Sequence, residues 1–199
     1  MAIKNRALED LLQRIGKQKP EQMMPPIYGS FWGYRHRARL STRFVIKKDR
    51  FFVGFHEKAS SYVADMQECH VLPKHVSNML VPLGNMMVTL SIYMRLPQIE
   101  LAVGDGVTAM VLRHLEPLSE TDLDTLRTFG NEWGVDWWLQ PGGPATAHRL
   151  EADKPVDLTY RIPSFGIRMR FRPTDFTQVN HMINDAMITR AVSLLDLKP

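Results

Sequence analysis

The sequence predicts an α+β fold in which a mainly antiparallel sheet, built from hairpins, is flanked by helices. Two observations lead to this prediction. Three segments have the pattern of hairpins, because paired runs rich in β-branched and aromatic residues are separated by short turn-like stretches. Around these hairpins, apolar residues recur at helical spacing. With 199 residues, the chain is long enough to bury a substantial core.

The N-terminal quarter is expected to hold a helix, a linker and the first hairpin. Over residues 3–16, apolar residues recur at helical spacing and Gly16 is a stop signal. The stretch "KPEQMMPPIYGS" contains three prolines and is expected to be a loop. From Tyr34 to Phe55, "YRHRARLSTRFVI" and "RFFVGF" flank the turn-like "KKDR", which predicts two paired strands.

The middle of the chain is expected to alternate helices with strands. Residues 73–93 have helical spacing interrupted by Pro82 and Gly84, which predicts two short helices. The strand-like "QIELAV" and "VTAMVLRHL" flank "GDG", whose glycines are expected to supply the positive φ angles of a tight turn. A further helix is predicted with Ser119 as N-cap, Asp122 at the third helical position and Gly134 at its end.

The C-terminal part is expected to be a strand, a loop, a hairpin and a helix. "VDWWLQ" predicts a strand, "PGGPATAHRLEADKP" a long surface loop, and "VDLTYRI" with "GIRMRF" a third hairpin. In the last helix the apolar residues fall on one side. They are Val179, Met182, Ile183, Ala186, Met187, Ala191, Leu194 and Leu195.

These elements divide the chain into four expected segments. Residues 1–19 form an N-terminal helix, residues 20–33 a linker, residues 34–178 a central α+β domain and residues 179–199 a C-terminal helix. Neither an internal repeat nor a low-complexity tract is evident in the sequence.

Composition points to the interior of the cell. No apolar run approaches the roughly 18 residues of a membrane span, so no membrane partner is expected. The charged N-terminus lacks the apolar region of a signal peptide. Cys69 is the only cysteine, which excludes an internal disulfide. We therefore expect a cytoplasmic protein.

Charge is unevenly distributed along the chain. Residues 1–50 carry twelve Lys or Arg against four acids, residues 100–158 carry eleven acids against four bases, and residues 159–199 return to a net charge of +3. In the last segment Arg168, Arg170 and Arg172 alternate. Basic ends around an acidic middle favour either a face that binds a polyanion or an ordinary solvated surface.

Three arginines alternate in "WGYRHRARLS". Strand periodicity places Arg35, Arg37 and Arg39 on one face, about 6.8 Å apart, which roughly matches successive phosphates of a nucleic-acid strand. A charged, solvated strand face is the alternative explanation.

Recognisable catalytic signatures are missing. Cys69 beside His70 is a weak metal signal, because a zinc site needs four ligands and a lone cysteine is usually a small core residue. The sequence contains no nucleophile elbow, P-loop or Rossmann glycine fingerprint.

Three successive motifs are similar to those of the S-adenosylmethionine-dependent RNA (uracil-C5) methyltransferases, above all the members that act on 23S ribosomal RNA. They are "WGYRHRARLS", "SSYVADMQECHVL" and "FRPTDFTQVNHMINDAMITRAVSLLDLKP". The resemblance covers residues 28–199. It implies that the chain is the central domain, which in this family lies between an N-terminal TRAM barrel with a cysteine-rich loop and a Rossmann-like methyltransferase domain.

The resemblance also implies which parts this chain lacks. In the family a cysteine adds to C6 of uracil, C5 takes the methyl group and a base removes the C5 proton. Both groups would lie beyond Pro199, so no catalytic residue is expected in this chain, which would be inactive alone.

Site residues follow from the resemblance one by one. Cys69 corresponds to the fourth ligand of a [4Fe-4S] cluster, which this chain alone could not hold because four thiolates are needed. Arg39 matches an arginine near the RNA, and Arg35 and Arg37 share its motif. Gln178 corresponds to a glutamine that contacts S-adenosylmethionine.

Phe176 would lie by the flipped target base, and either Thr177 or Asn180 would cap the final helix. The expected partner is ribosomal RNA, with no obligate protein partner inferred. A stand-alone RNA-binding or ribosome-associated module, or part of a transfer-RNA uracil-C5 methyltransferase, are the alternatives.

Overall fold

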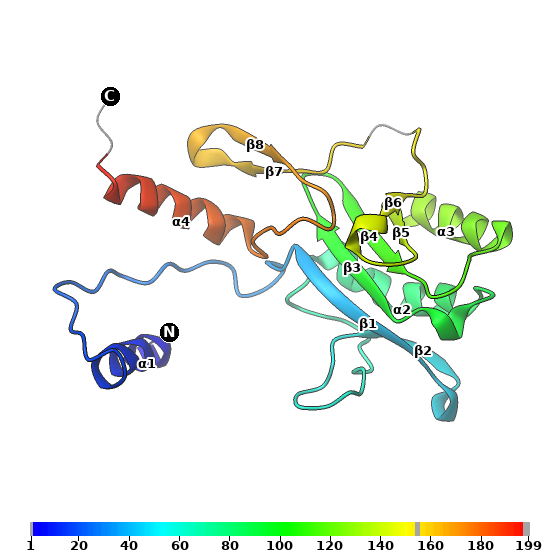
Figure 1. Ribbon diagram of the computed structural model, residues 1–199, viewed down its shortest axis with the longest axis horizontal. Coiled ribbons are helices and arrows are strands. Elements are labelled where there is room, and N and C mark those ends of the chain that lie inside the picture. Colours follow the sequence, from blue (N-terminus) through cyan, green and yellow to red (C-terminus); the bar gives the residue numbers. More distant parts are fainter. Residues whose placement is uncertain (1, 154–155, 197–199) are drawn as a thin grey trace.

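The computed structural model describes residues 2–153 and 156–196, and these form an α+β fold, as predicted (Figure 1). Six strands form one sheet in the order β2-β1-β3-β4-β5-β6, and two more form a separate hairpin. The strands are β1 (Arg37–Val45), β2 (Arg50–Gly54), β3 (Gln98–Val103), β4 (Thr108–Arg113), β5 (Val135–Gln140), β6 (His148–Arg149), β7 (Thr159–Ile162) and β8 (Ile167–Arg170). The α-helices are α1 (Ala2–Arg14), α2 (Lys74–Met87), α3 (Glu120–Trp133) and α4 (His181–Leu194).

The sheet is antiparallel except at one pair of strands. β1 pairs with β2 and β3, β3 with β4, and β5 with β6, all antiparallel. β4 and β5 run parallel, and α3 connects them. A parallel pair needs such a crossover, because a tight turn can join only antiparallel strands.

One face of the sheet carries the main core. Figure 1 shows α2 and α3 together behind the strands, and every second side chain of β1, such as Leu40, points into the core that they cover. A smaller cluster lies on the other face, where Ala102, Ala109 and Leu158 are buried with Phe171 packed against them. The segment that leads to the C-terminal helix therefore lies on the sheet face opposite α2 and α3.

The prediction of two short helices over residues 73–93 was wrong. A single helix, α2, extends from Lys74 to Met87 with Pro82 inside it. Gly84 explains why the helix continues. A Cβ atom there would lie 2.7 Å from the carbonyl oxygen of Phe51, so the glycine allows α2 to pack closely on β2. Tertiary packing outweighs the local helix-breaking effect of the proline.

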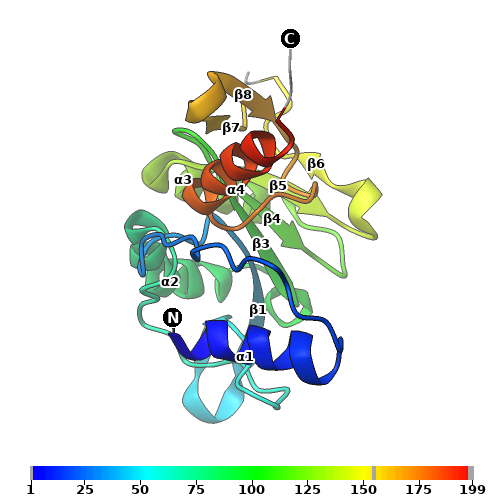
Figure 2. The ribbon, with the colours of Figure 1, turned by 90° about the vertical axis from the view of Figure 1, so that its left-hand side faces the viewer.

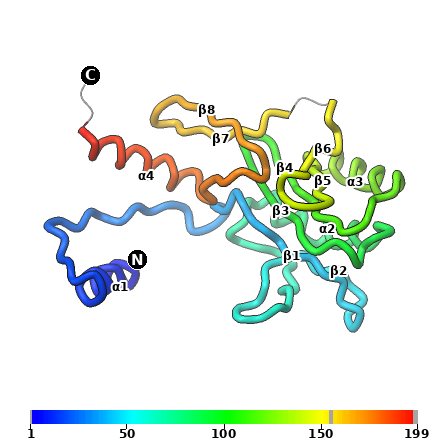
Figure 3. Tube along the Cα trace, viewed as in Figure 1, coloured from blue at the N-terminus to red at the C-terminus, as the bar shows by residue number. Residues whose placement is uncertain are grey.

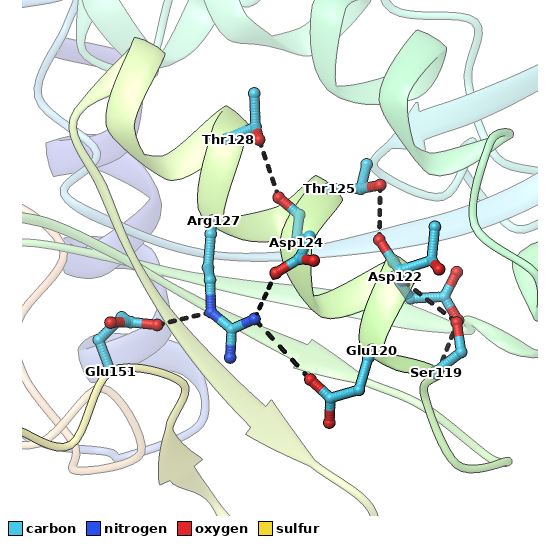
Figure 4. A network of polar contacts seen from close by, with 9 residues as sticks. Ser119, Glu120, Asp122, Asp124, Thr125, Arg127, Thr128 and Glu151 are labelled. Atoms are coloured by element: carbon cyan, nitrogen blue, oxygen red, sulfur yellow. Dashed lines mark hydrogen bonds and ion pairs between the residues drawn. The ribbon is translucent and has the colours of Figure 1, made fainter.

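The capping box of α3 is confirmed (Figure 4). The Ser119 hydroxyl accepts from the amide of Asp122, and the Asp122 carboxylate accepts from the Ser119 amide. Asp122 also accepts from the amide and hydroxyl of Ser91. Burial raises the pKa of Asp122, but these hydrogen bonds together hold the pKa below its usual value. The start of α3 is thus fixed to the loop after α2.

Arg127 connects the exposed side of α3 to the chain beyond β6. Its guanidinium contacts Glu151 at 2.8 Å and Asp124 at 2.6 Å (Figure 4). This arginine is partly exposed, so the contacts orient the segment more than they stabilise the fold.

Two loop predictions need correction. In the β3–β4 turn only Gly106 has a positive φ, +75°, whereas Gly104 is required because a Cβ would lie 2.6 Å from the carbonyl oxygen of Thr159. The stretch expected to be a surface loop contains β6, which pairs with β5. Residues 154 and 155 of that stretch lie outside the described residues.

The two ends of the chain extend away from the sheet (Figure 3). No residue of α1 or α4, both described in full, is buried. The linker runs beside α4, where Arg190 donates to the carbonyl of Pro25 and Gly29 lies close to Ile183. Figure 2 shows α1 and α4 apart from each other. Residues 197–199 of the expected C-terminal helix lie outside the described part of the chain.

None of the helices within the described ranges is both long and apolar enough to cross a membrane.

Candidate functional site

The segment between β8 and α4 forms a corner whose side chains alternate between solvent and core. The amide of Arg172 donates to the Asp175 carboxylate at 2.7 Å, which closes a turn after Pro173. Beyond this turn Phe176 is 85% exposed, Thr177 is buried and Gln178 is exposed. Alternation of this kind is typical of extended chain. Phe176 and Gln178 therefore both face solvent on the same part of the corner.

The corner ends in a helix cap. Asn180 is the N-cap of α4, and its side-chain oxygen accepts from the amide of Ile183 at 3.0 Å. Of the two predicted capping residues, Asn180 has this role and Thr177 is buried instead. The amide of His36 donates to the carbonyl of Val179 at 2.8 Å, which fixes this point to the chain just before β1.

Arg37 anchors the corner to the sheet. Its guanidinium donates to the carbonyl of Asp175 and lies 3.9 Å from the carboxylate of Glu100 on β3. Burial lowers the pKa of Arg37, while the charges of Glu100 and Asp175 oppose this shift. Because the Arg37 side chain is only 19% exposed, the structure places it beneath the corner rather than at the surface.

Arg39 and Arg35 occupy different environments. Arg39 is 68% exposed and donates to Glu100 at 3.0 Å. Arg35 precedes β1, and its guanidinium lies over the ring of Phe55, 5.6 Å from the centroid. The three predicted arginines therefore do not form one exposed strand face. The strand begins only at Arg37, and of the three side chains only that of Arg39 is freely presented to solvent.

Cys69 lines an open hollow of about 500 Å³ together with Trp32, His70 and Lys74. Its thiol is half-buried, and its amide donates to the hydroxyl of Ser77 at the start of α2. The described residues contain no group of three or more His, Cys, Asp or Glu side chains able to hold a metal ion.

A group of aromatic rings at the start of α4 is not evident from the sequence. The rings of His36 and His181 stack with centroids 4.4 Å apart, and Tyr160 stacks on the other side of His181 at 5.1 Å. Burial, reinforced by His36 and opposed by Asp105, lowers the pKa of His181 to about 4. The sequence shows that His181 directly follows the N-cap Asn180. It does not show that His36 and Tyr160 pack against this ring, because both are distant in sequence.

The contacts of Glu100 are not evident from the sequence either. It contacts both Arg37 and Arg39, and it is the only acid in its strand "QIELAV". Strand register, which the sequence does not reveal, pairs it with Arg39.

Comparison with known proteins gives a consistent set of relatives. No family model matches the sequence. The 23S rRNA (uracil(1939)-C(5))-methyltransferase RlmD of Bordetella avium is 56% identical over 199 residues, which is all of this chain and 42% of that protein. The protein of the same name from Bordetella pertussis is 57% identical, and 43% of its length is covered. The chain therefore spans less than half the length of the curated relatives it matches.

A solved structure with the same fold is the Pyrococcus abyssi tRNA (uracil-54, C5)-methyltransferase in complex with S-adenosyl-L-homocysteine. The TM-score is 0.63 with 15% sequence identity, and the match covers 94% of this chain and 46% of that one. At this identity the similarity supports the fold only.

Proposed function

Because the chain is homologous to part of the 23S rRNA (uracil-C5)-methyltransferases, we propose that it is the central, RNA-contacting domain of such an enzyme. In this proposal the whole enzyme methylates C5 of a uridine in 23S rRNA. The chain contributes RNA contacts and one side of the place where the target base meets the cofactor. The observation that carries the proposal is the corner, which holds an exposed aromatic ring and an exposed amide on an anchored backbone.

Phe176 has the properties of a stacking surface for a base. Its side chain is 85% exposed, which is unfavourable for a phenyl ring unless a partner covers it. An enzyme that acts on C5 of a uracil inside structured RNA must unstack that base, and stacking on an aromatic ring offsets about 1–3 kcal/mol of that cost. Arg37 holds the adjacent Asp175 carbonyl, so the ring is carried by a fixed backbone.

Gln178 fits a role in binding S-adenosylmethionine, which supplies the methyl group when bound. Its side chain makes no hydrogen bond within residues 2–153 and 156–196. A free amide can donate and accept at once, so it can pair with a polar edge of the cofactor and orient it. Buried Thr177 and the capped start of α4 hold Gln178 from both sides.

Cys69 fits as one of the four thiolates of a [4Fe-4S] cluster, provided that the other three come from outside this chain. The open hollow beside the thiol leaves room for such a group. Of Arg35, Arg37 and Arg39, Arg39 is best placed to bind a phosphate, because its side chain is 68% exposed and it shares Glu100 with Arg37.

We propose further that the chain does not transfer methyl groups alone, since Cys69 is its only cysteine and is assigned to the cluster. The exposed apolar side of α4 also supports a domain of a larger enzyme over a stand-alone module.

The test compares two neighbouring substitutions in the full-length enzyme. Gln178→Ala removes one hydrogen-bonding group, which is worth about 0.5–1.5 kcal/mol, and should weaken S-adenosylmethionine binding up to about tenfold with RNA affinity nearly unchanged. Phe176→Ala should weaken RNA binding and leave cofactor affinity nearly unchanged.

Calorimetry with the cofactor and a filter assay with labelled rRNA measure both affinities for both variants. Met94→Ala, at an exposed methionine outside the corner and α4, is the matched control. If Gln178→Ala leaves cofactor binding unaltered, the corner is only a helix cap.

A further inference from the structure

The β7–β8 hairpin presents three arginines on one face. Arg161 lies directly opposite Arg168, and Arg170 lies opposite Thr159. Directly paired residues share a face of the ribbon, and so do residues two positions apart. Arg161, Arg168 and Arg170 therefore point to the same side. The ring of Tyr160 is on the other side, where it packs edge-on against Phe171 and stacks on His181.

Stability of the hairpin does not account for this arrangement. Like charges placed directly opposite each other destabilise an antiparallel pair, and an isolated two-stranded hairpin is marginal already. The Arg168 side chain has no hydrogen bond or ion pair with any residue that the structure describes. On the strand opposite it lies a second arginine, Arg161.

The other two arginines each form an ion pair with a carboxylate, but both pairs are weak. Arg161 contacts Asp105 at 3.2 Å and Arg170 contacts Asp157 at 2.9 Å, and the arginine side chains are 61% and 81% exposed. Exposed pairs of this kind contribute about 0–1 kcal/mol, so an incoming anion can displace the carboxylates.

We propose that this arginine face binds the phosphate backbone of single-stranded RNA, as a contact surface in addition to the corner. The choice of RNA as the polyanion rests on the proposed function. Arg168 and Arg170 are two residues apart in a strand, about 6.8 Å, and each guanidinium can hold a phosphate through two parallel hydrogen bonds. Such contacts position a strand and do not read its sequence. The hairpin projects from the sheet beside α4 (Figures 1 and 2), and the exposure of Arg161 and Arg170 shows that this face is open to solvent.

The test measures the salt dependence of binding between the 199-residue chain and a short labelled oligouridylate by fluorescence anisotropy. Each phosphate neutralised on a single strand contributes about −0.7 to the log–log slope. A variant with Arg161→Gln, Arg168→Gln and Arg170→Gln should flatten the slope by up to about 2. The same three positions changed to Lys should keep most of the slope, because the charge remains.

Two further variants should strengthen RNA binding instead of weakening it. Asp105→Asn and Asp157→Asn remove the competing carboxylates and should tighten binding by about twofold to fivefold, the equivalent of a weak surface pair. Arg95→Gln is the matched control. Arg95 is also exposed and also paired, with Glu116, but it lies in another part of the chain, and its loss should leave the slope unchanged.

Three outcomes would overturn the inference. They are an unchanged slope in the Gln variant, looser binding in the Asn variants, and no binding by the unmodified chain at about 50 mM salt. A Gln variant with an unchanged slope but a lower thermal midpoint would show that the arginines stabilise the hairpin instead of binding RNA. Arg39→Gln and Phe176→Ala, measured in the same assay, test the corner separately. If only those two variants lose RNA binding, the proposed function stands and the proposal for the hairpin is wrong.

Discussion

The helices α3 and α4 are alike as local structures and opposite in what surrounds them. Each has 14 residues, and each begins with a side-chain N-cap, Ser119 in α3 and Asn180 in α4. Yet α3 buries Leu126 completely against the sheet, whereas no residue of α4 is buried and Met187 is 47% exposed.

The difference shows that caps and apolar spacing specify a helix, but not what the helix packs against. In the region around α3, apolar side chains are buried against other residues of the chain. In the region of α4, the corner and the hairpin, they remain on the surface together with unpaired arginine charge. Surfaces of this kind usually bind a partner. We therefore expect substitutions in the first region to affect stability and substitutions in the second to affect binding.

The largest expected contrast is between Leu126→Ala and Met187→Ala. Leu126→Ala leaves a cavity in the core and should lower the free energy of unfolding by about 2–5 kcal/mol. Met187→Ala removes exposed atoms and should change it by less than about 0.5 kcal/mol. Urea denaturation of the chain, followed by circular dichroism, measures both. Equal changes in the free energy of unfolding would mean that α4 is packed in solution. They would contradict the contrast between α3 and α4.

Two glycines provide a second contrast. A Cβ at Gly84 would lie 2.7 Å from the backbone oxygen of Phe51, while a Cβ at Gly29 would lie 2.9 Å from the flexible end of Ile183 on α4. Gly84→Ala should destabilise the fold by about 1–3 kcal/mol, because backbone cannot move aside. Gly29→Ala should be nearly neutral. The thermal midpoints of both variants test this, and a neutral Gly84→Ala would show that α2 can shift on β2.

Removing the capping side chains should destabilise the whole fold in the case of α3 but only the start of the helix in the case of α4. Asp122→Ala removes the partners of Ser91 and Ser119 and should reduce the free energy of unfolding by about 1–2 kcal/mol. Asn180→Ala should leave global unfolding nearly unchanged and only fray α4. Hydrogen exchange at the Ile183 amide, which Asn180 accepts from, measures the fraying. Unchanged exchange there would contradict the capping role.

The last contrast depends on pH and lies at the seam between the two regions, where His181 stacks on His36. The folded pKa of His181, about 4, lies below its ordinary value of 6.5, so the folded state favours the neutral ring. Stability is therefore fully present above pH 6.5 and falls as the pH decreases from 6.5 towards 4. His181→Phe keeps the ring but cannot be protonated, so its thermal midpoint should fall less over this range. His148→Phe, at an exposed histidine, is the control, and the same pH dependence in His181→Phe as in the unmodified chain would contradict the assignment.

Local patterns in the sequence were sufficient for most elements. Alternation and turn residues identified all three hairpins, and Ser119, Asp122 and Gly134 marked both ends of α3. The same reasoning failed for α2, because the Gly84 contact that offsets the effect of Pro82 comes from another strand. It also failed for β6, a two-residue strand that exists only because β5 lies beside it.

The sequence by itself determined the fold class and the cap of α3, because these depend on neighbours within a few positions. The tertiary structure alone decided which arginines are neutralised by a partner and which remain free. Strand register placed Glu100 beside Arg37 and Arg39, and chain packing placed Phe55 under Arg35. Likewise, only the pairing of β7 with β8 brought Arg161 opposite Arg168. Such contacts join residues far apart in sequence, so no local pattern encodes which charge is neutralised and which remains free for a ligand.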